Sequence, residues 1–125
     1  MVAKVFVASL PTRYDAATQA DVPSLDLNPA TDHGELTIVT RGPQRTGDEL
    51  DNALMDVYSM LRDNYNYGRG DCILMVGDPI LNGVAMSAAL DGGRDKGDHP
   101  NDWEPIVVLR WNRREHKYDK VEIEP

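Results

Sequence analysis

Two arginines and one aspartate follow three apolar segments of strand length, and together they could bind an anion. Arg13 comes after the first segment, Arg41 after the second and Asp78 after the third. In an open α/β sheet the carboxyl ends of parallel strands meet at one edge, and ligands bind there. We therefore treat Arg13, Arg41 and Asp78 as a candidate ligand site. The arginines would supply positive charge, and the helix expected after Asp78 would supply free N–H groups.

Asp78 has a simpler interpretation as a helix cap. It precedes Pro79, and a carboxylate at the N-cap accepts hydrogen bonds from the N–H groups of the first helical turn. Proline fits the first helical position because its missing N–H would have no partner there. A capping carboxylate would also repel an anion, and the chain has neither a P-loop nor a G-x-G-x-x-G motif. A small nucleotide- or phosphate-binding α/β enzyme is therefore the alternative function and not the favoured one.

Aromatic and basic side chains alternate near the C-terminus, at an expected turn between two strands. Trp111, Arg113, Arg114, His116 and Lys117 form this candidate interaction surface. Aromatic groups among basic groups can bind single-stranded nucleic acid by stacking and charge. However, the formal net charge is −8, with 13 basic and 21 acidic residues, and an excess of acid opposes attraction to phosphates. We expect a protein partner, and nucleic-acid binding through this hairpin is the weaker alternative.

No residues have the spacing of a nucleophile, a base and an orienting acid. The histidines His33, His99 and His116 fall in separate loops, where we expect them to be exposed. The single cysteine, Cys72, lies in an apolar segment, where a thiol is inert. The acids between residues 91 and 104 match no calcium-loop spacing. We expect no catalytic residue, no metal and no cofactor.

The elements that must position these side chains are centred on residues 72–76. This apolar run is bounded by Gly70-Asp71 and Gly77-Asp78, and its unbroken hydrophobicity predicts a strand buried on both faces of a sheet. A helix is predicted from about residue 79 to residue 90, ended by Asp91-Gly92-Gly93. Its many small residues favour close packing on the sheet.

Another helix is predicted from Thr46 to about Tyr65. Thr46 and Glu49 have the spacing of a capping box, in which each side chain bonds the backbone N–H of the other residue. Apolar residues recur at helical spacing on one side of this helix and should face the core. The stripe consists of Leu50, Ala53, Leu54, Val57, Leu61 and Tyr65.

The order strand, strand, helix, strand, helix, strand, strand predicts a single small α/β domain over residues 1–125. Four further strands are predicted at residues 4–10, 35–40, 105–111 and 118–124. Strand–helix–strand units give parallel neighbours, so we expect a mostly parallel five-stranded sheet with an antiparallel C-terminal hairpin.

Two irregular stretches and one edge strand complete this architecture. Residues 12–34 and 91–104 are expected to be loops, the first of them covering one sheet face. In the last strand we expect Val121 and Ile123 to point inward. Lys120 and Glu122 should point outward, where their charges protect the sheet edge.

Composition is that of a soluble protein: the chain has 125 residues, of which 41% are hydrophobic and 27% charged. No apolar run reaches the length of a membrane span, and no basic-then-apolar signal opens the chain. We therefore expect a cytoplasmic protein without a membrane partner, and the possibility of a homo-oligomer stays open.

Three segments resemble a group of small uncharacterised proteins encoded by tailed bacteriophages. They are PSLDLNP at residues 23–29, MVGDP at residues 75–79 and LRWNRR at residues 109–114. The resemblance covers most of the chain and implies a role in the host bacterial cytoplasm during infection. It assigns no residue a role, because these motifs carry no catalytic meaning. It favours a non-enzymatic accessory protein that binds and modulates a host or phage protein.

Overall fold

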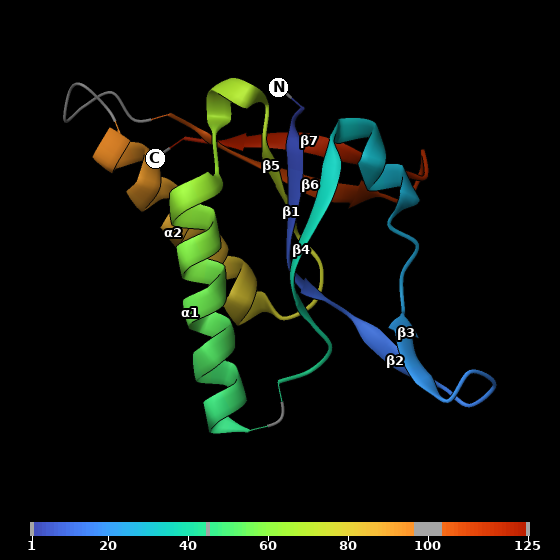
Figure 1. The fold of residues 1–125 in the computed structure, drawn as a ribbon. Helices are drawn as coiled ribbons and strands as arrows, with labels where there is room; N and C mark the ends of the chain where they lie inside the picture. The colour runs from blue at the N-terminus through green and yellow to red at the C-terminus, as the bar shows by residue number, and fades with distance from the viewer. Residues whose placement is uncertain (1, 45, 97–103, 125) are drawn as a thin grey trace.

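The fold is built on a five-stranded sheet in the order β4-β1-β5-β6-β7 (Figure 1). The computed structural model describes residues 2–44, 46–96 and 104–124. The strands of the sheet are β1 (Lys4–Leu10), β4 (Glu35–Arg41), β5 (Cys72–Leu74), β6 (Ile106–Asn112) and β7 (Lys117–Ile123). β1 is parallel to β4 and β5, and β5 to β6, whereas β6 and β7 are antiparallel. The predicted α/β sheet with its antiparallel C-terminal hairpin is confirmed, and the central strand lies mid-sheet.

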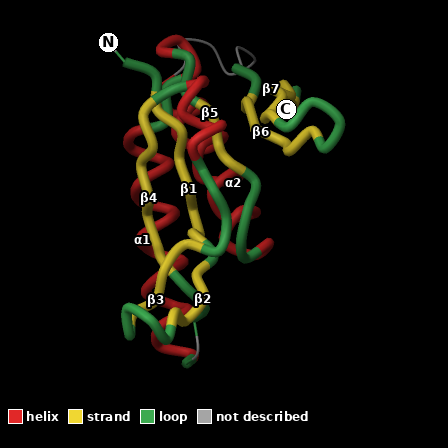
Figure 2. Tube along the Cα trace, turned by 90° about the vertical axis from the view of Figure 1, so that its right-hand side faces the viewer, coloured by secondary structure: helices red, strands yellow, loops and turns green. Residues whose placement is uncertain are grey.

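Both long helices, α1 (Gly47–Asn64) and α2 (Pro79–Lys96), cover the same face of the sheet and pack on each other (Figure 2). The capping box of α1 is confirmed: the Glu49 N–H donates to Thr46 Oγ1 over 3.0 Å, and the Thr46 N–H donates to Glu49 Oε2 over 3.2 Å. The predicted apolar stripe of α1 faces the core, with Val57 and Leu61 fully buried.

The predicted end of α2 at residue 90 is wrong, since the helix continues to Lys96. Gly92 explains the error. A Cβ atom on Gly92 would lie 2.2 Å from the carbonyl oxygen of Arg62 in α1. The glycine therefore allows two helices to approach closely and does not stop the second one. Of the predicted acidic loop, residues 97–103 lie outside the described residues, and Asp91 is helical, where its carboxylate accepts a bond of 2.9 Å from Tyr58 Oη.

The other face of the sheet is covered by residues 24–33, as expected. This segment includes the 3-10 helix η1 (Asn28–His33). Leu27 and Ala30 are buried there, against Val7 and Leu109 of the sheet. The rest of the expected loop is not irregular. It forms the antiparallel hairpin of β2 (Thr12–Asp15) and β3 (Ala20–Pro23), in which proline takes the last position of an edge strand.

The buried carboxylate of Asp71 connects three segments, although the sequence predicts for this residue only the boundary of a strand. Asp71 is fully buried. Its Oδ1 accepts from the Lys4 N–H and from Arg69 Nε, both over 2.8 Å, and its Oδ2 accepts from the Asn66 N–H over 3.0 Å. Arg69 Nη2 lies 2.5 Å from the same Oδ2. Asp71 therefore ties the start of β1 and the turn after α1 to the start of β5.

The last strand differs from the prediction in its exposure. Val121 and Ile123, expected to be buried, are 40% and 36% exposed. Both lie on the helix-covered face, because they pair with the buried Val108 and Ile106 of β6. β7 is the outermost strand, and neither residue belongs to the buried core clusters of the described chain.

Candidate functional site

Of the three residues of the predicted ligand site, Arg41 and Asp78 lie at or after the end of a strand, whereas Arg13 lies inside a strand. Arg13 lies in β2 and Arg41 ends β4, and both are exposed. Asp78 Oδ1 accepts a hydrogen bond of 2.8 Å from the Ile80 N–H, which confirms its role as a cap. Within the described residues no hydrogen bond or ion pair joins any two of the three. The anion site therefore stays a prediction.

The ends of β1 and β5 are packed together by main chain. A Cβ atom on Gly77, whose φ is +78°, would lie 2.1 Å from the Ser9 carbonyl oxygen. Only glycine fits this close approach, so the turn after β5 lies directly on the end of β1. Asn82, from the first turn of α2, holds the turn by donating from Nδ2 to the Val76 carbonyl over 2.9 Å.

The tip of the β6–β7 hairpin brings three aromatic rings together. The ring centroids of Trp111 and Tyr118 are 5.0 Å apart, and those of Trp111 and His116 are 6.3 Å apart, both edge to face. Trp111 is 41% exposed, whereas Tyr118 is 5% exposed. Tyr118 therefore forms a buried support on which an accessible indole rests in a fixed orientation.

The turn is held by Asn112 and not by the basic residues. Asn112 Oδ1 accepts from the N–H groups of Arg114 and Glu115 over 3.0 and 3.2 Å, and its Nδ2 donates to Asp119 Oδ2 over 2.9 Å. His116, with φ of +51°, completes the turn. The guanidinium groups of Arg113 and Arg114 are exposed and have no hydrogen bond or ion pair with the described residues.

Lys117, the fifth residue of the predicted surface, is partly neutralised. Its Nζ lies 2.9 Å from Glu115 Oε2 and 4.0 Å from Asp119 Oδ1. The hydrogen bond to Glu115, followed by the charges of Glu115 and Asp119, raises the pKa of Lys117. Lys117 is exposed but paired with acids. The other four residues of this surface, Trp111, Arg113, Arg114 and His116, have no ion pair with the described residues, and we call these four the hairpin tip.

His33 was expected to be exposed and unconnected, and this prediction is wrong. It is half-buried, and its Nε2 lies 2.7 Å from the Tyr118 carbonyl oxygen. Burial, with a smaller contribution from the charge of Asp26, raises the pKa of the Tyr118 hydroxyl. Residues 26–33 thus border the hairpin, a contact that spans 85 residues in sequence and that no local pattern predicts.

The thiol of Cys72 lies in surroundings that make it unreactive. Cys72 is fully buried, and burial raises the pKa of its thiol to about 11, so the reactive thiolate is scarce at neutral pH. No group of three or more His, Cys, Asp or Glu side chains among the described residues could hold a metal ion. None of the described helices is long and apolar enough to span a membrane.

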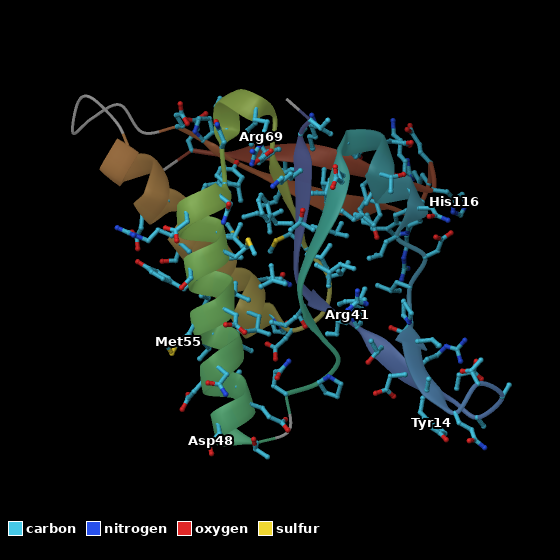
Figure 3. The ribbon with its side chains drawn as sticks, viewed as in Figure 1. Tyr14, Arg41, Asp48, Met55, Arg69 and His116 are labelled. Carbon is cyan, nitrogen blue, oxygen red and sulfur yellow. The ribbon has the colours of Figure 1, made fainter. Side chains whose placement is uncertain are left out.

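An open groove of about 400 Å³ runs between β4 and α1 on another part of the molecule. It is lined by Ile38, Val39, Asp56, Ser59, Met60, Asp63 and Asn64. Figure 3 shows Arg41, at the end of β4, well separated from His116 at the hairpin turn. Arg41 and the hairpin tip are therefore not parts of one site.

Comparison with known proteins identifies a family whose description names no activity. A family model described as phage Pam3 gp32-like protein matches residues 3–125, nearly the whole chain. The chain belongs to this family. The resemblance to phage proteins is thereby confirmed, and the description names no activity. Neither the curated proteins nor the solved structures gave a match.

Proposed function

We propose that this phage protein is a non-enzymatic accessory factor that binds and modulates a host or phage protein through the hairpin tip. The observation that carries the proposal is the 41% exposed Trp111, which contacts the rings of Tyr118 and His116. Beside it lie Arg113 and Arg114, whose guanidinium groups have no hydrogen bond or ion pair within the described part of the chain. Tryptophan and arginine are the residue types that most often dominate the energy of protein interfaces. A ring that is already held in place loses little conformational entropy when a partner binds it.

The chemistry of the hairpin tip indicates the kind of surface it fits. The indole requires an apolar pocket, and Arg113 and Arg114 require carboxylates or carbonyl oxygens beside that pocket. Asn112 and Asp119 hold the turn from within, so the two guanidinium groups project from a defined frame. We infer a partner protein with an acidic rim around an apolar cavity.

The test compares two exposed aromatic residues on two different hairpins. The native chain, Trp111→Ala and Tyr14→Ala would each be cross-linked to proteins of a bacterial lysate, and a captured protein would be purified and titrated. Tyr14 is 66% exposed in β2 and serves as the matched control. We expect Trp111→Ala to weaken affinity by at least about tenfold, with Tyr14→Ala unchanged. Equal behaviour of the two variants, or no saturable partner, would contradict the proposal.

A thermal-shift screen separates this function from the enzyme alternative. Nucleotides, inorganic phosphate and divalent metal ions should leave the melting temperature of the native chain unchanged. A stabilisation that disappears in both Arg13→Ala and Arg41→Ala would instead support an anion site at the strand ends.

A further inference from the structure

β7 is a regular edge strand, and over its second half its outer side pairs with no other strand of residues 2–44, 46–96 and 104–124. All seven of its residues pair with β6 in one continuous antiparallel register, from Lys117 with Asn112 to Ile123 with Ile106. By contrast, the opposite edge strand, β4, lacks a pair for Val39 within its ladder to β1. A straight, unbulged edge strand is the geometry that accepts another strand.

The direction of the backbone groups of β7 follows from bonds on the other side of β6. The Met75 N–H donates to the Leu109 carbonyl over 3.2 Å, and the Val107 N–H donates to Tyr65 Oη over 3.0 Å. The backbone N–H and C=O groups of residues 107 and 109 therefore point away from β7, and those of residues 106, 108, 110 and 112 bond to it. It follows that the backbone N–H and C=O groups of residues 118, 120 and 122 of β7 point outward, away from β6. The His33 bond to the Tyr118 carbonyl confirms this. Among the described residues no backbone group bonds to the outer side of Lys120 or Glu122, and we call these two the open positions.

Side chains on this strand suit pairing with a copy of itself. We propose that two copies of the chain associate through antiparallel pairing of their β7 strands about a two-fold axis at Val121. In this register Lys120 of each copy lies opposite Glu122 of the other, twice over, and the two Val121 side chains meet. Val121, which one copy leaves 40% exposed, meets Val121 of the other copy directly, and Ile123, 36% exposed, lies opposite Asp119 and gains that Val121 as a diagonal neighbour. Opposite charges directly across an antiparallel pair are stabilising.

The neighbouring registers are disfavoured by charge. Because the outward groups are those of residues 118, 120 and 122, a two-fold register must pair even-numbered residues with even-numbered ones. With the axis at residue 120, the Lys120 side chains of the two copies lie opposite each other. With the axis at residue 122, the two Glu122 side chains do. Like charges directly opposite each other are destabilising, so the axis at Val121 is selected.

The contact is small, so the association should be weak and reversible. Edge pairing over a few residues buries less than the about 1,200 Å² of a standard interface. Each copy also carries a formal charge of −8, which opposes association at low ionic strength. Measurements therefore belong at about 0.15 M salt, where charges further apart than about 8 Å are screened.

The first test uses charge reversal and mixing, with sedimentation equilibrium as the readout. The native chain should pass from the 13.9 kDa monomer to twice that mass as concentration rises. Lys120→Glu puts acids at both open positions, and Glu122→Lys puts lysines at both. Each variant alone should dimerise at least about tenfold more weakly, whereas an equimolar mixture should form a heterodimer. Glu122→Lys also removes the 3.1 Å hydrogen bond from Tyr67 Oη, so both variants need matching circular dichroism spectra.

Two exposed positions away from β7 provide the control for these charge changes. Arg113→Glu and Glu35→Lys alter charge by the same amounts, and both side chains are exposed. Each of these variants should retain native self-association. If they lose it as fully as the β7 variants do, net charge and not strand register governs association, and the proposed register is wrong.

The second test is cross-linking through introduced cysteines. Val121→Cys places two thiols on Cα atoms about 4.5 Å apart across the axis, within the range that a disulfide spans. Ile123→Cys is the matched control, because Ile123 lies opposite Asp119 and its two copies are roughly 13 Å apart. The native Cys72 is fully buried and should not interfere.

Mild oxidation should give a covalent dimer for Val121→Cys and little for Ile123→Cys. Three results would each overturn the proposal. They are a native chain that stays monomeric near 1 mM, equal cross-linking of the two cysteine variants, and no heterodimer on mixing. A contact of about −4 kcal/mol is half-saturated at roughly 1 mM. The hairpin tip is not part of this contact, so its outcome is independent of the proposed function.

Discussion

The two faces of the sheet are covered by very different amounts of structure. On one face lie two helices of 18 residues each, which bury large side chains such as Phe6, Leu61 and Leu81 completely. On the other face lies the single segment 24–33, whose 3-10 helix has six residues and whose buried apolar contribution is Leu27 and Ala30.

This difference indicates which part of the protein opens first. A long helix satisfies its own backbone hydrogen bonds and presents an apolar stripe over several turns. The segment 24–33 depends on a few contacts, among them Leu27 and the His33 bond to Tyr118. Regions with few buried contacts open at a lower free energy than the core. The hairpin tip therefore stands beside the less strongly held face.

The largest effect is expected on the helix-covered face. Leu61→Ala removes a fully buried side chain that packs between α1 and the sheet. The lost apolar contact and the remaining cavity should lower the free energy of unfolding by about 3 kcal/mol, measured by urea denaturation. Met55→Ala, at a 68% exposed position on the same helix, is the control and should change stability little.

A smaller but more local effect is expected from Leu27→Ala on the other face. Leu27 is 8% exposed and the segment that carries it can relax, so we expect a loss of about 2 kcal/mol. Because Cys72 belongs to the same apolar cluster, its thiol should react with a thiol reagent about tenfold faster than in the native chain, through local opening.

If the reactivity of Cys72 follows global stability alone, the face covered by residues 24–33 does not open before the helix-covered face. In that case Leu61→Ala, which lowers global stability more, would accelerate the reaction more than Leu27→Ala. Native Cys72 should react slowly at neutral pH in any case, because burial raises the pKa of its thiol to about 11.

The smallest effect at neutral pH concerns Tyr65, which joins α1 to β6. Its hydroxyl accepts the Val107 N–H over 3.0 Å, and Tyr65→Phe leaves that N–H without this partner, at a cost of about 1 kcal/mol. Burial raises the pKa of Tyr65 to about 12. The unfolded phenol has its pKa near 10, so it ionises first, and the native chain loses stability as pH rises from about 10 to about 12.

Tyr65→Phe lacks this ionisation, so the stability difference between the two proteins should narrow over that alkaline range. Urea denaturation at a series of pH values measures it. A difference that stays constant from pH 8 to about pH 12 would show that the hydroxyl is not held protonated by burial.

Local chemistry made several elements predictable. The Thr46–Glu49 capping box and the apolar stripe of α1 depend on residues within a few positions of each other, and both are confirmed. Asp78 accepting from the Ile80 N–H is equally local. The order of elements, together with the rule for strand–helix–strand connections, was enough to predict a mostly parallel sheet with an antiparallel final strand.

The errors arose where a residue serves a distant segment. Gly92 was predicted to end a helix because glycine commonly does so, but its partner is the Arg62 carbonyl of another helix. The β2–β3 hairpin was missed because its proline and its acids are typical of loops. Val121 and Ile123 have the alternation of a half-buried strand, yet their exposure depends on whether a helix extends over β7.

The sequence by itself determined the five strands of the main sheet, where the two long helices begin, and that the domain is acidic with a buried thiol. These properties follow from backbone sterics, capping and periodicity, which act over one or two turns. Only the tertiary structure decided that Asp71 is a buried anchor, that His33 meets Tyr118, and that Trp111 rests on a buried ring. The Asp71–Lys4 and His33–Tyr118 bonds join residues 67 and 85 positions apart, and Trp111 meets Tyr118 only in the register of the folded hairpin. Composition and local spacing do not specify such contacts.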